Sequence, residues 1–142
     1  MKVREIMTNN VASNTTSCTI DAVAKKMKEL NVGSIPICDN ANNVVGIATD
    51  RDIVIRGICD GLQSSDNIGK VMTNQLISIS PEAHAHEAAK LMAENQIRRL
   101  PVVENGKLVG VLSIGDLAVQ NIYENEAGSA LSDISTPCRP TM

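Results

Sequence analysis

The sequence has almost no aromatic residues: it contains one tyrosine and neither phenylalanine nor tryptophan. Proteins that bind single-stranded nucleic acid stack the bases on aromatic rings, and this sequence cannot supply such a platform. The net charge of −3 also leaves no broad basic face to attract a phosphate backbone. We therefore expect no nucleic-acid partner, and any planar ligand must be held by aliphatic side chains and backbone.

Long apolar runs and closely spaced cysteines are absent as well. No apolar run approaches the length of a membrane span, and the start MKVREIMT lacks the apolar region of a signal peptide. The sequence thus predicts a cytoplasmic protein without a membrane partner. The four cysteines, Cys18, Cys38, Cys59 and Cys138, are far apart and form no CxxC pair. We expect the cysteines to be small buried hydrophobic residues in a reducing compartment rather than zinc ligands. A redox role for an exposed Cys138 is the alternative.

The sequence does contain an internal repeat. When Met7 is aligned with Met72, identical residues recur along both halves of the chain. The further identical pairs include Thr8 and Thr73, Asn9 and Asn74, Ser13 and Ser78, Ala24 and Ala89, Lys25 and Lys90, Met27 and Met92, and Pro36 and Pro101. The second copy then loses one residue, because a tight Asn105-Gly106 turn replaces the longer loop of residues 40–43, and Gly46 aligns with Gly110.

Each copy has the pattern strand, helix, strand, strand, helix. A short apolar segment (Val11–Ser13 or Leu76–Ile79) comes first, and apolar residues at helical spacing follow it. These residues are Ile20, Val23, Met27 and Leu30 in the first copy, and Ala85, Ala88 and Met92 in the second. Next come two strands, SIPIC and VVGIAT or RLPVV and LVGVLS, and a closing helix. The repeated methionines are interpreted as core filler.

These patterns predict an α+β fold of two tandem β-α-β-β-α repeats, packed with pseudo-twofold symmetry because one repeat alone is too small to bury its faces. We place the first repeat at residues 1–59, a linker rich in Gly, Ser and Asp at 60–69, and the second repeat at 70–123. Residues 124–142 form a C-terminal tail with a weak helical stretch at Ala127–Ile134.

Both copies close on a hydroxyl followed three residues later by a carboxylate: Thr49 and Asp52 in GIATDRDIV, and Ser113 and Asp116 in GVLSIGDLA. This T/S-x-x-D pattern is a variant of the capping box at a helix start, which is a purely structural role. The same groups can also bind a ligand, because a carboxylate accepts hydrogen bonds from two ribose hydroxyls. Capping boxes favour the longer Glu or Gln, so the shorter Asp in both copies favours a group aimed outward at a ligand.

The order of these motifs in both copies resembles the CBS domain family, in which paired repeats form a regulatory module (a CBS pair, or Bateman module). The segments TDRDIV and IRRLPVV are similar to those of small stand-alone bacterial members. The resemblance implies an adenine-nucleotide sensor with two clefts between the repeats. In each cleft the Asp holds the ribose, residues before the apolar-Pro strand of the other repeat reach the phosphates, and aliphatic residues hold the base.

Transferred to this sequence, the resemblance implies one well-furnished cleft and one doubtful cleft. The main cleft would use Thr49 and Asp52 for the ribose, Arg98, Arg99 and Arg51 for the phosphates, and Ile47, Ile97 and Pro101 for the base. The second cleft would use Ser113, Asp116, Gly33, Ser34, Pro36 and Val111, and it lacks a basic pair. A solvated strand edge is the structural alternative for Arg98 and Arg99.

The sequence favours a non-catalytic module, homodimeric according to the resemblance, that senses AMP, ADP, ATP or a related adenosyl compound and acts on an unidentified downstream protein. No obligatory cofactor and no metal site are expected, since His84 and His86 are two residues apart and face different sides of a helix. An enzyme is the first alternative, but no nucleophile–base pair or glycine-rich phosphate loop is present. The second alternative is a structural dimerisation module that binds no nucleotide.

Overall fold

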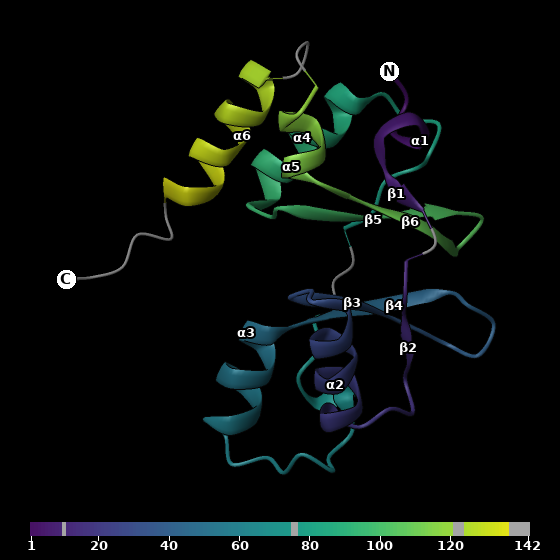
Figure 1. The fold of residues 1–142 in the computed structure, drawn as a ribbon, viewed down its shortest axis with the longest axis vertical. Coiled ribbons are helices and arrows are strands. Elements are labelled where there is room, and N and C mark those ends of the chain that lie inside the picture. Colours follow the sequence, from purple (N-terminus) through teal and green to yellow (C-terminus); the bar gives the residue numbers. More distant parts are fainter. Residues whose placement is uncertain (10, 75–76, 121–123, 137–142) are drawn as a thin grey trace. The chain divides into compact units, whose positions relative to one another are not determined.

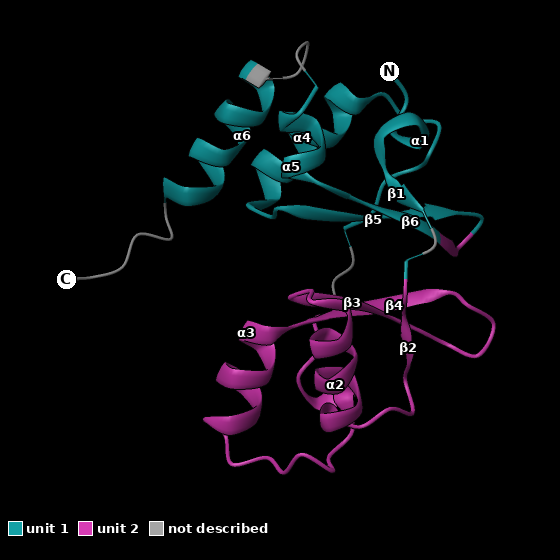
Figure 2. Cartoon of the chain, in the orientation of Figure 1, with its two compact units in different colours: residues 1–11, 77–105, 109–142 teal, residues 12–76, 106–108 magenta. Residues whose placement is uncertain are grey.

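The computed structural model describes residues 1–9, 11–74, 77–120 and 124–136 (Figure 1). The fold is mixed α+β, as predicted, and it divides into two compact units (Figure 2). Unit 1 comprises Met1–Val11, Ile77–Asn105 and Val109–Met142, and unit 2 comprises Ala12–Leu76 and Gly106–Leu108. None of the helices in the described ranges has the length and apolar character that a membrane span requires.

Unit 2 contains a three-stranded sheet in the order β2-β3-β4, with α2 and α3 on one side of β3 and β4 (Figure 1). Its strands are β2 (Asn14–Thr15), β3 (Ser34–Cys38) and β4 (Val44–Thr49). Its helical elements are α2 (Ile20–Leu30), α3 (Asp50–Asp52), the π-helical turn η1 (Ile53–Ile58) and the 3₁₀ turn η2 (Ile68–Lys70). The first strand lies at residues 14–15 rather than at the predicted Val11–Ser13, because residues 14 and 15 pair with Ile37 and Cys38.

Unit 1 repeats this plan around a sheet in the order β1-β6-β5. Its strands are β1 (Thr8–Asn9), β5 (Arg99–Glu104) and β6 (Lys107–Ser113), and its helices are α1 (Val3–Ile6), α4 (Ala85–Asn95), α5 (Ile114–Ala118) and α6 (Glu124–Ser135). Of the strand predicted at Leu76–Ile79, Leu76 lies outside the described residues, and Ile79 forms a single parallel bridge with Val102. The predicted Asn105-Gly106 turn is confirmed, with φ of 53° and 80° at its two residues.

Each unit has its own apolar core, and the residues predicted from helical spacing contribute to both cores. In unit 2, Ile20, Val23 and Met27 of α2 are buried, whereas Leu30 in the last turn is 46% exposed. In unit 1, Ala85, Ala88 and Met92 of α4 are all wholly buried. The strand residues Ile35, Ile37 and Ala48 complete the core of unit 2, and Leu100, Val102 and Leu112 complete that of unit 1.

The two repeats exchange their first segments. Thr73, at the start of the second repeat, exchanges two backbone hydrogen bonds of 2.8 and 3.1 Å with Ile47 of β4 in unit 2. In unit 1, Thr8 of the first repeat lies opposite Val111 of β6 in an antiparallel pair. The wholly buried Val3 likewise belongs to the core of unit 1. The compact units therefore do not coincide with the repeats that the sequence delimits at residues 1–59 and 70–123.

This exchange explains the glycine shared by both closing motifs. A Cβ at residue 46 would lie 2.6 Å from the Thr73 carbonyl oxygen, and one at residue 110 would lie 2.8 Å from that of Thr8. The sulfur atoms of Met72 and Met7 lie 3.3 and 2.8 Å from the same two positions. Only glycine allows the exchanged segment to approach the strand so closely.

The segment predicted as a linker, residues 60–69, is bound to unit 2. Ile20 and Asp21 donate backbone hydrogen bonds of 2.9 and 3.0 Å to the carbonyl oxygens of Asp66 and Ser64, and Ile68 is wholly buried. Residues 62–68 thereby pack against the start of α2.

The C-terminal helical stretch predicted at Ala127–Ile134 lies within α6. Ala127, Ala130 and Ile134 are at most 3% exposed, and α6 packs against α4 and α5 of unit 1. The small alanine side chains allow this close packing of helices. Residues 137–142 of the predicted tail, including Cys138, lie outside the described residues.

We expect Gly46→Ala to lower the free energy of unfolding by about 1–3 kcal/mol, because the new methyl group would overlap a backbone carbonyl that cannot rotate away. Urea denaturation measures the effect. Gly128→Ala is the matched control: no atom lies within 4 Å of that position in α6, so it should stabilise by about 0.5–1 kcal/mol. Similar stabilities for the two variants would contradict the close approach at residue 46.

Candidate functional site

Both T/S-x-x-D motifs form capping boxes at the end of a strand. In unit 2, the Thr49 hydroxyl accepts a hydrogen bond of 3.0 Å from the Asp52 amide, and Asp52 Oδ2 accepts one of 3.0 Å from the Thr49 amide. In unit 1, the corresponding distances for Ser113 and Asp116 are 3.1 and 2.9 Å. The structural role weighed for this motif is therefore present in both copies.

The inference from the short aspartate side chain is wrong in part. Each carboxylate reaches back to its own turn with one oxygen, because the extended backbone of the cap residue (ψ of about 160°) brings its amide close. The second oxygen is not part of the capping box. The Asp52 side chain is only 12% exposed, so its orientation is fixed by its surroundings.

Arg56, which is not among the predicted site residues, contacts the same turn. Its Nη1 atom lies 3.6 Å from Asp52 Oδ1 and donates hydrogen bonds of 2.9 Å to the Val71 carbonyl and 3.4 Å to Thr73 Oγ1. The spacing of four residues between Asp52 and Arg56 on a helix was the available signal. The second copy has Gln120 at this position.

The strand that follows α2 brings three further predicted residues to the turn in unit 2. The Gly33 carbonyl accepts a hydrogen bond of 2.9 Å from Asp50, and Ser34 lies opposite Thr49. Pro36 lies opposite Ile47, two residues earlier in β4. These residues were predicted for the second cleft, so unit 2 combines parts of both predicted sets.

Unit 1 has the same arrangement, but Arg98 and Arg99 occupy the positions that Gly33 and Ser34 have in unit 2. The Arg98 carbonyl accepts a hydrogen bond of 2.8 Å from Ile114, directly after Ser113. Arg99 begins β5, which lies beside β6 in the sheet. Arg98 and Arg99 are both exposed and lie at the same end of the hairpin as the Ser113–Asp116 turn.

The predicted main set draws on both units. Ile47, Thr49, Arg51 and Asp52 belong to unit 2, whereas Ile97, Arg98, Arg99 and Pro101 belong to unit 1. Their combination at one ligand therefore stays a prediction. Of the apolar members of the two sets, Ile47, Ile97 and Val111 are half-buried, and Pro36 and Pro101 are buried.

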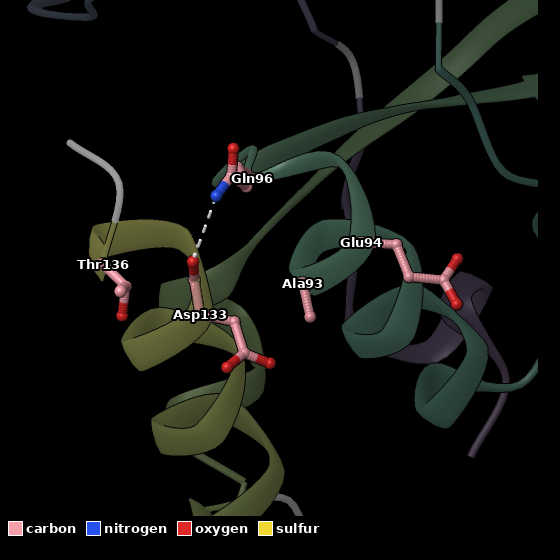
Figure 3. A pocket seen from close by; sticks show the side chains of 5 residues that line it. All are labelled: Ala93, Glu94, Gln96, Asp133 and Thr136. Atoms are coloured by element: carbon pink, nitrogen blue, oxygen red, sulfur yellow. Dashed lines mark hydrogen bonds between the residues drawn. The ribbon is translucent and has the colours of Figure 1, made fainter.

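Two depressions on the units contain none of the predicted residues. The first, of about 460 Å³, is lined by Ala93, Glu94, Gln96, Asp133 and Thr136, and Gln96 donates a hydrogen bond of 3.4 Å to the Asp133 carbonyl across it (Figure 3). Its two carboxylates do not suit a phosphate. The second, of about 310 Å³ in unit 2, lies between α2 and η1 and is lined mainly by apolar side chains, such as those of Ile20, Ile53 and Ile58.

The two histidines contact different groups. His84 caps α4 by accepting a hydrogen bond of 3.1 Å from the His86 amide, and His86 Nδ1 lies 2.7 Å from Glu126 Oε2 of α6. The two rings are 6.4 Å apart. Within the described ranges, no group of three or more His, Cys, Asp or Glu side chains could hold a metal ion.

Of the three cysteines in the described ranges, one is buried as predicted. Cys38 is buried, and burial raises the pKa of its thiol. Cys18 is half-buried, and a hydrogen bond with the Thr15 hydroxyl lowers the pKa of its thiol. Cys59 follows η1 and is exposed, so the expectation of a buried residue is wrong there.

The comparisons with known proteins define the class. The model of the CBS domain matches this chain twice, at residues 3–56 and 68–120, and the chain belongs to the CBS domain family. The protein YlbB of Bacillus subtilis (strain 168) is 42% identical over 135 residues, which cover 94% of this chain and 91% of YlbB.

Solved structures share the fold. The crystal structure of Hypoxic Response Protein I with two coordinated zinc ions has a TM-score of 0.79 at 32% identity, covering 84% of this chain and 98% of that one. The crystal structure of CBSX2 in complex with AMP has a TM-score of 0.74 at 24% identity, covering 87% and 98%. The predicted CBS pair is thereby confirmed as the fold of this chain.

We expect Thr49→Ala and Ser113→Ala each to lower the free energy of unfolding by about 0.5–2 kcal/mol, because a backbone amide loses its hydroxyl acceptor. Urea denaturation tests this expectation. Thr49→Ser and Ser113→Thr, which keep the hydroxyl, serve as controls and should remain close to the wild type. Alanine variants that unfold at the wild-type urea concentration would show that the caps contribute nothing to stability.

Proposed function

We propose that this protein is a regulatory module that binds an adenine nucleotide with residues of both CBS repeats and transmits binding to another protein. CBS-domain proteins are generally non-catalytic regulatory modules, and we propose no catalysis here. We further propose that it acts as a homodimer in the cytoplasm.

The observation that carries the proposal is the fixed carboxylate of Asp52. One of its oxygens is bound to the Thr49 amide, and the other lies beyond hydrogen-bond distance of Arg56. Oδ1 therefore keeps lone pairs for the hydroxyl groups of a ribose, and the arginine offsets part of the charge that would repel phosphates. The AMP complex of CBSX2 supports the proposal to the extent that a protein of this fold accommodates AMP.

The remaining groups follow from the residue types. Arg98 and Arg99 are exposed residues whose guanidinium groups suit phosphate oxygens, and Arg51 is a third. Ile47 and Ile97 are half-buried aliphatic residues for the base. In the second set, Gly33 and Ser34 take the place of the basic pair, so we propose that this set binds a phosphorylated ligand weakly or not at all.

A structural dimerisation module is the second candidate, and a specific observation favours it. The capping boxes account for the hydroxyl and for one oxygen of the carboxylate in both motifs without any ligand. In addition, three apolar residues of η1 in unit 2 are exposed: Val54 is 48% exposed, Ile55 47% and Ile58 70%. Such an apolar face suits association with another chain.

Asp52→Asn separates the two candidates. Asparagine still offers an oxygen to the Thr49 amide, so stability should change little, whereas the charged acceptor for the ribose is lost. Hydrogen bonds to charged groups contribute about 1.5–3 kcal/mol, so affinity for AMP, ADP or ATP should fall roughly 10- to 100-fold in titration calorimetry. Asp116→Asn is the matched control in the other copy and should have a smaller effect. Unchanged affinity in Asp52→Asn would reject the ribose role.

The double substitution Arg98→Ala, Arg99→Ala tests phosphate recognition. We expect the affinity for AMP to fall roughly 10- to 100-fold and that for adenosine by less than about threefold, because adenosine has no anionic group. Replacing two exposed lysines of α2, Lys25→Ala with Lys28→Ala, changes the net charge equally and serves as the control. Equal losses for AMP and adenosine would contradict a phosphate role.

A further inference from the structure

Arg56 connects three groups of unit 2. One nitrogen, Nη1, lies 2.9 Å from the Val71 carbonyl, 3.4 Å from Thr73 Oγ1 and 3.6 Å from Asp52 Oδ1. Val71 and Thr73 belong to the segment that begins the second repeat and pairs with β4. The Arg56 side chain is 48% exposed, but the hydrogen bond to the Val71 carbonyl gives its guanidinium group a defined position.

The distance to Asp52 determines what Arg56 can do. At 3.6 Å the contact is an ion pair and too long for a good hydrogen bond, so it orients the carboxylate without consuming a lone pair of Oδ1. The Thr49 amide holds the other oxygen at 3.0 Å. The carboxylate is thus restrained from both sides while one oxygen can still accept from a hydroxyl.

The second copy lacks this restraint. Gln120 stands where the first copy has Arg56, and within the described ranges Asp116 makes no ion pair with a cation. The helices after the two turns differ as well. The turn of unit 2 continues into the π-helical η1, which contains Arg56, whereas the five-residue α5 follows the turn of unit 1. Short π-helical turns often occur at functional sites.

We propose that Arg56 is the positioning residue that orients the Asp52 carboxylate for the two hydroxyls of a ribose. Recognition of the sugar diol is then a property of the unit 2 turn, and the unit 1 turn discriminates poorly between ribose and deoxyribose. This inference rests on the proposed function, since it requires that Asp52 binds the sugar of an adenine nucleotide.

The test compares AMP with 2′-deoxy-AMP by titration calorimetry in the wild type, Arg56→Gln, Asp52→Asn and the double variant. Wild type should prefer AMP. Arg56→Gln should weaken AMP binding roughly 2- to 150-fold, the range given by coupling between residues in contact, and should change 2′-deoxy-AMP binding little. In the Asp52→Asn background, Arg56→Gln should have no further effect, because the carboxylate that it orients is gone.

Controls separate positioning from folding. Gln120→Ala at the equivalent position should leave both affinities unchanged. Arg56→Lys keeps a cation and a donor, so it should restore part of the preference for AMP if Arg56→Gln loses too much stability to be measured. Thermal unfolding of each variant reports the loss of the Val71 contact separately.

The outcomes are distinct. Absence of AMP binding in the wild type would overturn the proposed function and this inference together. Wild-type preference for AMP that persists in Arg56→Gln would overturn the inference alone. Equal losses for AMP and 2′-deoxy-AMP would also overturn it, since they indicate a structural role for Arg56.

Discussion

The close contact between an exchanged segment and a glycine is the constraint on which both units depend. Thr73 pairs with Ile47 in unit 2, and Thr8 pairs with Val111 in unit 1. Each of these strands ends in a T/S-x-x-D turn and has its hairpin partner on its other side. The glycine one residue earlier removes the Cβ that would collide with the incoming carbonyl. The end of the strand is therefore held by backbone hydrogen bonds on both edges.

This constraint has a consequence for the candidate site. A carboxylate orients a ligand well only if its own backbone is fixed, and the turn that carries Asp52 follows a strand with two paired edges. Arg56 adds a link to the same exchanged segment through Thr73. The groups that stabilise the fold and the groups proposed to bind the sugar are thus neighbours on one short stretch of chain. Stability and affinity must be measured separately for every substitution there.

Much of the fold could be predicted because its signals are local. The helical spacing of Ile20, Val23 and Met27, and the Asn105-Gly106 turn, are properties of a few adjacent residues. The exchange of first segments could not be predicted, because β1 is two residues long and Thr73 forms only an isolated bridge, so neither segment has a periodicity to detect. The hydrogen bond between the Asp52 carboxylate and the Thr49 amide also depends on the ψ angle of Thr49, which amino-acid composition does not determine. Arg56 was missed because its main anchor, the Val71 carbonyl, is fifteen residues away.

The two copies provide an internal comparison that separates structural from functional residues. Both need a glycine under the exchanged segment and a hydroxyl with a carboxylate in the cap, and both have them. The cations differ between equivalent positions of the two copies. Arg56 in the first copy is equivalent to Gln120 in the second, and Arg98 and Arg99 in the second copy are equivalent to Gly33 and Ser34 in the first. A shared fold does not require these charges, since each unit forms its turn with or without them. Differences confined to positions that the fold leaves free are the residues to examine for ligand recognition. Here they are Arg56 beside the turn of unit 2, and Arg98 with Arg99 beside the turn of unit 1.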